Sequence, residues 1–155
     1  MKRLLALLLF LSLAVFTGGC DLTDYTDDSI QLRNGEVYEY FQHDSYAGGD
    51  FHGLRFDSAT RAQIMIFLDP LEEADSNHPI KTAKDAAYYG ASALDSHIRN
   101  WTMVDTVGVV HNPEANLWLV HGMFYDRNTP GEAWAVVLDA ETGKVLGFSE
   151  LDGDT

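Results

Sequence analysis

Cys20 is the only cysteine of the chain, and its thiol is the most nucleophilic group that the sequence offers. It follows the small residues Thr17-Gly18-Gly19, which end an apolar run at residues 4–16, and it precedes an acidic stretch at 21–29. A bilayer span takes about 20 residues, so this run is too short to cross a membrane but suits the core of a signal peptide. With Lys2 and Arg3 before it, the run predicts a signal peptide over residues 1–19.

Gly18, Gly19 and Cys20 resemble the lipobox of bacterial lipoproteins, although Thr17 stands where that motif prefers an aliphatic residue. The resemblance implies that Cys20 becomes the N-terminus of a mature chain and carries fatty acyl chains such as palmitate. Two or more acyl chains hold a protein stably on a membrane. The implied location is the bacterial cell envelope, facing the periplasm or the exterior. Asp21 matches the residue that retains enteric lipoproteins at the inner membrane, which weakly favours that membrane.

An ordinary secretory signal is the alternative. It would leave Cys20 as a lone free thiol, and such a thiol tends to pair between molecules in an oxidising compartment. The lipid anchor is therefore the better interpretation of this cysteine.

The composition excludes one class of partner. The chain has 24 acidic and 10 basic residues and a formal net charge of −14. Nucleic-acid binding needs clustered Lys and Arg, so no nucleic acid is expected as a partner. Residues 20–31 hold four aspartates and no basic residue, which predicts a flexible acidic tether before a single globular domain at 32–155.

The clearest predicted element is one amphipathic helix that begins after Pro79. Apolar residues recur at spacings of three and four, which places them on one helix face: Ile80, Ala83, Ala87, Ala91, Leu94 and Ile98. Thr82 followed by Asp85 predicts the N-terminal cap. Tyr89 is expected opposite the apolar stripe.

Strands are predicted on both sides of this helix. After it, alternating patterns and turn residues predict four strands, at 103–111, 117–125, 132–139 and 144–150. Before it, strands are expected at 36–42, 51–57 and 61–69, the last two joined by a turn. The predicted fold is α+β, an antiparallel meander with one main helix packed on one face.

The segment WAVVLDAETGKVLGF resembles the closing hairpin of PepSY domains, and the preceding helix and hairpin stand in that family's order, so the resemblance covers residues 79–150. In the turn, Asp139 is expected to accept backbone hydrogen bonds, Thr142 belongs to the same motif, and Gly143 is expected at positive φ. The resemblance implies a cystatin-like α+β shape and a secreted or membrane-anchored protein. No catalytic residue belongs to the motif. In some proteases, domains of this family occur in propeptides and are proposed to inhibit peptidases.

No metal or cofactor site is expected. None of the six histidines has a partner at zinc-site spacing, and no cysteine remains in the mature fold beyond Cys20. His111 and His121 flank one hairpin. If residues 113–116 form its loop, Gly108 rather than His111 lies opposite His121.

The final strands are apolar on both faces. Ala135 and Val137 point away from the face expected to contact the helix, so either the first half of the chain covers them, which we favour, or a partner does. The candidate partner contacts are accordingly Tyr89, Ala135 and Val137.

These observations favour a lipid-anchored envelope lipoprotein with a non-catalytic, PepSY-like binding or inhibitory domain. Its expected partners are the membrane, through the anchor, and an envelope protein or peptidase. The alternative is a structural lipoprotein that assembles through its sheet. A small hydrolase is least favoured, because no catalytic constellation is evident.

Replacing Cys20 by serine should abolish the anchor, because only the thiol can carry the thioether-linked lipid. We expect Cys20→Ser to accumulate as uncleaved precursor or to appear in the soluble fraction. Metabolic labelling with radioactive palmitate and cell fractionation measure both effects. Equal labelling of the serine variant would refute the assignment.

Overall fold

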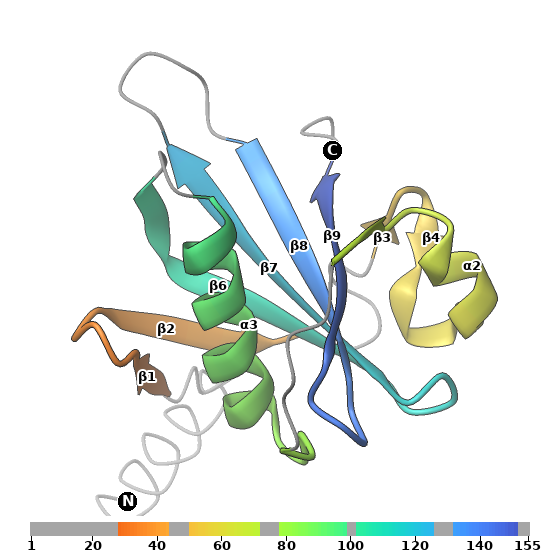
Figure 1. Cartoon of the computed structure of the whole chain (residues 1–155), viewed down its shortest axis with the longest axis horizontal. Coiled ribbons are helices and arrows are strands. Elements are labelled where there is room, and N and C mark those ends of the chain that lie inside the picture. The colour runs from red at the N-terminus through yellow and green to blue at the C-terminus, as the bar shows by residue number, and fades with distance from the viewer. Residues whose placement is uncertain (1–27, 44–49, 72–77, 99–101, 126–131, 152–155) are drawn as a thin grey trace, which may run out of the picture.

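The C-terminal half forms the centre of the structure, a computed structural model that describes residues 28–43, 50–71, 78–98, 102–125 and 132–151 (Figure 1). Its strands form the predicted antiparallel meander: β6 (Thr102–Asn112), β7 (Leu117–Tyr125), β8 (Glu132–Asp139) and β9 (Val145–Leu151). β7 and β8 have the predicted bounds, and β6 and β9 differ from them by one residue at each end.

Three short strands extend the meander into a mixed sheet in the order β1-β2-β6-β7-β8-β9-β5. They are β1 (Ser29–Gln31), β2 (Val37–Gln42) and β5 (Asp69–Pro70). β2 runs parallel to β6, so the prediction of a purely antiparallel sheet is wrong at this junction. Parallel neighbours require a long crossover connection, and here the crossover contains the main helix.

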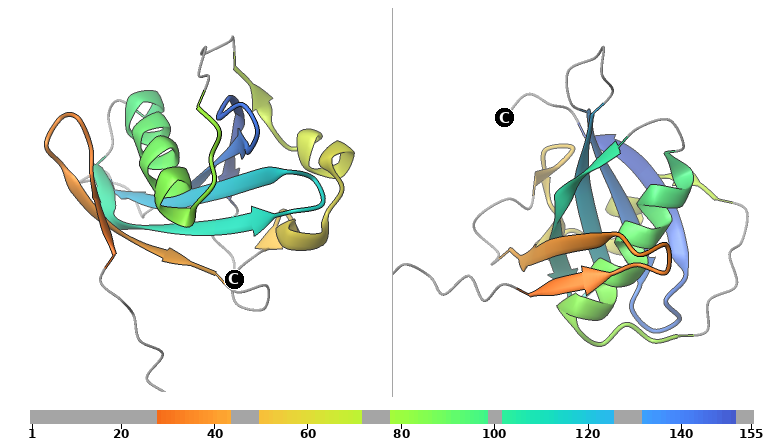
Figure 2. Two further views of the ribbon diagram at one scale, coloured as in Figure 1. Left: turned by 90° about the horizontal axis from the view of Figure 1, so that it is seen from below. Right: turned by 90° about the vertical axis from the view of Figure 1, so that its left-hand side faces the viewer.

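The main helix, α3 (Ala83–His97), lies across one face of the sheet (Figure 2). Thr82 caps it as predicted, because its hydroxyl oxygen accepts a hydrogen bond from the backbone N–H of Asp85 at 3.1 Å. The buried helix residues are small apart from Leu94, which lets the helix approach closely. A Cβ on Gly90 would lie 2.4 Å from the Cβ of Val120, so no larger residue fits there without movement.

The residues between β2 and α3 form a different structure from the one predicted. They contain β3 (Asp50–Phe51), β4 (Leu54–Arg55), the 3₁₀ helix η1 (Phe56–Ser58) and the helix α2 (Arg61–Met65). The predicted strand at 61–69 is therefore wrong, and the one predicted at 51–57 is replaced by two strands of two residues each and a 3₁₀ helix. Thr60 and Gln63 form a reciprocal capping box that starts α2, and this local signal overrides the β-forming residues that follow.

This segment covers the second face of the sheet and creates a second core. The side chains that this segment and the sheet contribute to the second core are fully or almost fully buried: Phe51, Phe56, Ala59, Ile64, Leu68, Val110, Leu117, Leu119, Ala135 and Val137. The favoured prediction of a cover from the first half holds, although helical turns rather than strands supply most of it. Ala135 and Val137 have no exposed surface, so their proposed role as partner contacts is corrected to a packing role.

The folded part begins earlier than predicted. β1 lies within the segment 20–31 that was expected to be a tether, and Ile30 is only 4% exposed in the core beneath α3. Its apolar side chain and its pairing with Tyr38 in β2 order this end of the segment. The rest of the predicted tether and the predicted signal peptide lie outside the described residues.

The turn between β8 and β9 has the geometry that its sequence predicts. The side-chain oxygen Oδ1 of Asp139 accepts hydrogen bonds from the backbone N–H groups of Glu141 and Thr142, and from the Thr142 hydroxyl, at 3.0–3.1 Å. Gly143 has φ +70° and donates its N–H to the Asp139 carbonyl at 2.8 Å. Glycine adopts this left-handed conformation without the strain that a Cβ introduces.

Gly143→Ala should lower the free energy of unfolding by about 1–2 kcal/mol, because alanine is strained at positive φ. Gly143→Asn should cost less, since asparagine tolerates that region. Urea unfolding of the purified protein measures both, with Glu141→Ala as a control at an exposed position of the same turn. An alanine variant as stable as wild type would show that the turn relaxes to negative φ.

Candidate functional site

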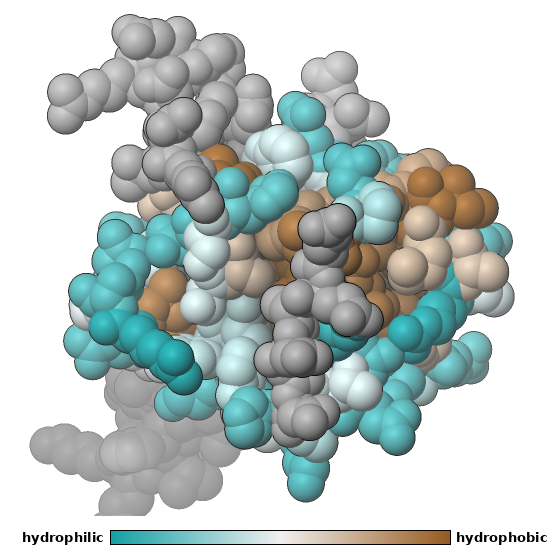
Figure 3. All heavy atoms as spheres, in the orientation of Figure 1, coloured by the Kyte–Doolittle hydropathy of each residue, from teal (hydrophilic) through white to brown (hydrophobic). Residues whose placement is uncertain are grey.

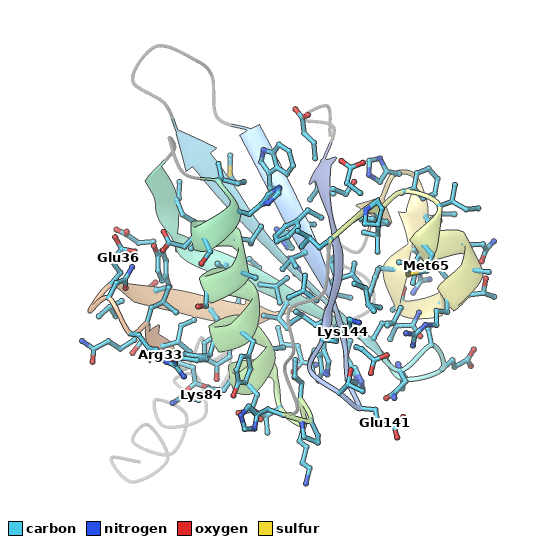
Figure 4. All side chains as sticks on the ribbon, in the orientation of Figure 1. Arg33, Glu36, Met65, Lys84, Glu141 and Lys144 are labelled. Carbon is cyan, nitrogen blue, oxygen red and sulfur yellow. The ribbon has the colours of Figure 1, made fainter. Side chains whose placement is uncertain are left out.

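An open pocket of about 330 Å³ lies between β1 and the N-terminal half of α3. Its lining combines apolar, aromatic and charged side chains: Ser29, Ile30, Gln31, Lys84, Asp85, Tyr88 and Tyr89. The helix residues are two adjacent pairs four positions apart, so one side of α3 presents them together. Figure 4 shows Lys84 beside β1, at the N-terminal end of α3.

Two tyrosines give the pocket its aromatic wall. The rings of Tyr88 and Tyr89 meet edge to face at 5.3 Å, and Tyr89 stacks on His78 at 6.3 Å. Both tyrosines are half-buried, which holds their rings while leaving part of each accessible. The predicted contact Tyr89 therefore lies at a pocket. Tyr88 lies there with it.

The opposite wall is the edge strand of the sheet. Among the described residues, β1 pairs only with β2, so its other side is the sheet edge. Asp28 anchors its start: the backbone N–H of Tyr40 donates to the Asp28 carbonyl at 3.1 Å, and the Tyr40 hydroxyl donates to its carboxylate at 3.0 Å. Burial, followed by this hydrogen bond, raises the pKa of Tyr40 to about 12, so the hydroxyl stays protonated at neutral pH.

On the second face of the sheet, His43 and His121 meet across β6. Their Nε2 atoms are 3.0 Å apart, although the residues are 78 positions apart in sequence. The register places Gly108 beside His121, as the sequence predicted, and His111 beside Trp118. Burial, and then the neighbouring His43, lower the pKa of His121 to about 4. Sequence spacing gave no signal for this pair, because the parallel β2–β6 contact creates it.

A serine and a histidine also meet on this face. The Nε2 atom of His52 lies 2.5 Å from the Ser149 hydroxyl, and His52 adopts the unusual φ of +51°. A histidine hydrogen-bonded to a serine hydroxyl is the arrangement that can activate serine as a nucleophile. However, Ser149 is only 4% exposed, and in the described part of the chain no carboxylate bonds the other ring nitrogen of His52. A substrate cannot reach this hydroxyl, so the arrangement is a buried hydrogen bond.

The Asp139 turn carries an ion pair that sequence analysis missed. The Arg61 guanidinium donates to Asp139 Oδ2 at 2.7 Å, linking α2 to the β8–β9 turn. Burial alone would raise the pKa of Asp139, but hydrogen bonds from Arg61 and Thr142 outweigh it and hold the pKa below its usual value. The prediction of α2 as a strand concealed this partner. The roles of Asp139, Thr142 and Gly143 are structural.

Several sequence expectations fall outside these sites. Cys20 lies outside the described residues. Within the described ranges, no helix has the length and apolar character needed to cross a bilayer. In the same ranges, no group of three or more His, Cys, Asp or Glu side chains is placed to hold a metal ion. Comparisons with protein-family models, curated proteins and solved structures give no match to this chain.

The Asp139 ion pair should stabilise the fold at neutral pH and lose its effect in acid. The folded-state pKa lies below the unfolded value of about 3.9, so the stabilisation is complete above that value and disappears as the pH falls through the folded-state pKa. Asp139→Asn should therefore reduce the free energy of unfolding by about 1–3 kcal/mol at pH 7. The gap to wild type should narrow below about pH 4.

Asp57→Asn is the matched control, because the Arg55–Asp57 pair has the same 2.7 Å contact but joins residues only two positions apart, whereas Asp139 also holds the β8–β9 turn. Exposed pairs contribute about 0–1 kcal/mol, so this variant should change little. Unfolding curves at several pH values measure both proteins. A gap for Asp139→Asn that persists undiminished to pH 2 would exclude an ionised Asp139 as its cause.

Proposed function

We propose that this protein is a lipid-anchored lipoprotein of the bacterial cell envelope whose α+β domain binds a protein partner and catalyses no reaction. The apolar run, the small residues and Cys20 support the anchor. The fold, a mostly antiparallel sheet with one main helix, is compatible with the PepSY-like interpretation of residues 79–150. The inner membrane, weakly favoured by Asp21, is the proposed location.

The observation that carries the binding role is the pocket between β1 and α3. An edge strand presents unpaired backbone N–H and C=O groups, and an extended peptide can add to such an edge as a further strand. Tyr88 and Tyr89 then offer aromatic surface to a side chain of that peptide. Aromatic residues beside a sheet edge are well suited to this mode of recognition.

Charge narrows the class of partner. Loss of Lys2 and Arg3 with the signal peptide would take the formal charge of the mature chain from −14 to −16, since two positive charges leave. A surface of this sign repels acidic partners and favours neutral or basic ones. A peptidase or another envelope protein that inserts an extended, non-acidic segment beside β1 is the proposed partner. If the partner is a peptidase, a domain that holds such a segment in its pocket would inhibit that peptidase.

A structural lipoprotein remains the second candidate, because one apolar patch is exposed. Met65, Ile66, Phe67 and Leu71 are between 38% and 76% exposed at the end of α2 and around β5. Figure 3 shows apolar residues gathered on this side of the molecule. Exposed apolar patches commonly mark interfaces, and this one would support assembly between lipoproteins.

Position-specific photo-cross-linking in living cells separates these candidates. A photoreactive amino acid at position 89 should give one discrete adduct with a different protein, whereas the same amino acid at the exposed position 141 should give none. Lys84→Ala together with Tyr88→Ala should weaken the adduct at position 89 without lowering the amount of protein.

The second candidate predicts another pattern. Cross-linking from position 66, in the apolar patch, would then give adducts of the protein with itself or with other lipoproteins, while position 89 would give none. That outcome would overturn the binding role of the pocket. Equal adducts from positions 89 and 141 would have the same effect, because they would indicate contact without specificity.

A further inference from the structure

The two histidines that meet on the second face of the sheet, His43 and His121, occupy a site that the binding role does not use. Their side chains are half-buried beside an otherwise apolar core, where polar rings cost desolvation energy. Each Nε2 atom faces the other at 3.0 Å, so in the neutral pair one ring donates its hydrogen and the other accepts it. A fold that needed only packing here would gain more from apolar side chains.

The surroundings hold both rings in place. The backbone N–H of His43 donates to the Val109 carbonyl at 2.9 Å, which fixes the end of β2 against β6. Phe41 contacts both imidazoles edge-on, with ring centroids 4.5 Å from His43 and 6.3 Å from His121. A Cβ on Gly108 would lie 2.1 Å from the His121 Nε2 atom and 2.7 Å from that of His43, so only glycine lets the rings meet.

We propose that His43 and His121 form a two-imidazole site for a divalent transition metal ion, with Cu²⁺ the ion bound most tightly. Metal–imidazole bonds of about 2.0–2.1 Å at a right angle place two nitrogen atoms about 2.9 Å apart, whereas a tetrahedral angle places them about 3.3 Å apart. The observed 3.0 Å is the distance of the hydrogen bond between the two rings, and either geometry is reached by a shift of a few tenths of an ångström.

The chemistry of the donors favours Cu²⁺. Imidazole is a ligand for copper, zinc, iron and nickel, and among divalent ions the affinity of a nitrogen site peaks at Cu²⁺. The metal takes the place of the hydrogen between the two Nε2 atoms, and the ring that carried it keeps its hydrogen on Nδ1 instead. Met123, on the same face two residues along β7, is 46% exposed, so solvent reaches this side of the sheet. Water completes the coordination.

The site has a structural consequence for the chain. His43 follows β2 and His121 belongs to β7, with β6 between them. A metal held by both rings would tie the β1–β2 hairpin to the central meander. Since β1 forms one wall of the pocket, the ion would also stabilise that wall. The metal site and the partner site are nonetheless separate, and either can exist without the other.

Copper binding to the full-length protein in detergent tests the proposal. Competition against chelators of known affinity should show one Cu²⁺ per chain, with Zn²⁺ bound more weakly. His43→Gln and His121→Gln should each weaken Cu²⁺ binding by more than the roughly 10- to 100-fold that loss of an outer-shell partner costs. His111→Gln is the matched control and should leave the affinity unchanged, because His111 stacks on Trp118 at 4.1 Å instead.

Electron paramagnetic resonance of the Cu²⁺-loaded wild type gives a readout that does not depend on whether any variant folds. The wild-type spectrum should show coupling to two imidazole nitrogens, and each single variant that folds should show one. Cu²⁺ should also raise the melting temperature of wild type but not that of a folded double variant, as expected for a ligand that binds only the folded state. Circular dichroism establishes which variants fold.

Three results would overturn the proposal. Wild type could lack saturable Cu²⁺ binding, its Cu²⁺ spectrum could show no imidazole coupling, or a folded double variant could bind Cu²⁺ as tightly as wild type. The first would leave the pair as a hydrogen bond between two rings. The other two would place the copper elsewhere in the chain. None of these results bears on the pocket.

Discussion

The close contact between α3 and the sheet positions most of the other elements. Gly90 lies against Val120, and the neighbouring buried helix residues are alanines, so the helix axis comes nearer to the sheet than larger side chains would allow. This approach brings Tyr88 and Tyr89 into contact with the helix-side core and beside β1. A bulkier helix face would lift both tyrosines away from the edge strand, and the pocket would not form.

The two faces of the sheet are covered by different means. α3 covers one face with a long amphipathic surface, whereas the other face is closed by short elements whose large side chains, such as Phe51, Phe56 and Ile64, fill the space. The Arg61–Asp139 ion pair attaches this cover to the β8–β9 turn. The segment from β3 to α2 does not cover the whole second face of the sheet. His43 and His121 occupy another part of that face, so polar rings lie there beside apolar strands.

The sequence was sufficient for elements defined by local patterns. The bounds of β7 and β8, the Thr82 cap and the positive φ of Gly143 each depend on residues within a few positions of one another. The apolar residues after Thr60 predicted a strand, but the capping box formed by Thr60 and Gln63 makes the α2 segment a helix. The parallel pairing of β2 with β6 could not be predicted, because no local pattern specifies which distant strand becomes a neighbour.

In the candidate sites, too, local features were predictable from the sequence and contacts between distant residues were not. Tyr89 was found because its position on a helix is periodic, but β1 had been assigned to the tether, so the second wall of its pocket was missed. Arg61 reaches Asp139 across 78 positions, and His43 reaches His121 across the same separation. Both contacts depend on the tertiary path of the first half of the chain. Spacing rules for nearby ligands therefore had no means to detect them.

The parallel junction between β2 and β6 also constrains the order of folding. The meander from β6 to β9 joins strands that are neighbours in sequence, so its loops close at low entropic cost and it can form early. Glu39 of β2 and its partner Thr106 of β6 are far apart in the chain. The β1–β2 hairpin can therefore join the sheet only after β6 has formed. The hairpin precedes β6 in the chain, so it emerges first yet reaches its native partner late. Until then its edges are exposed, and this is the interval in which the chain is most vulnerable to wrong pairing or proteolysis.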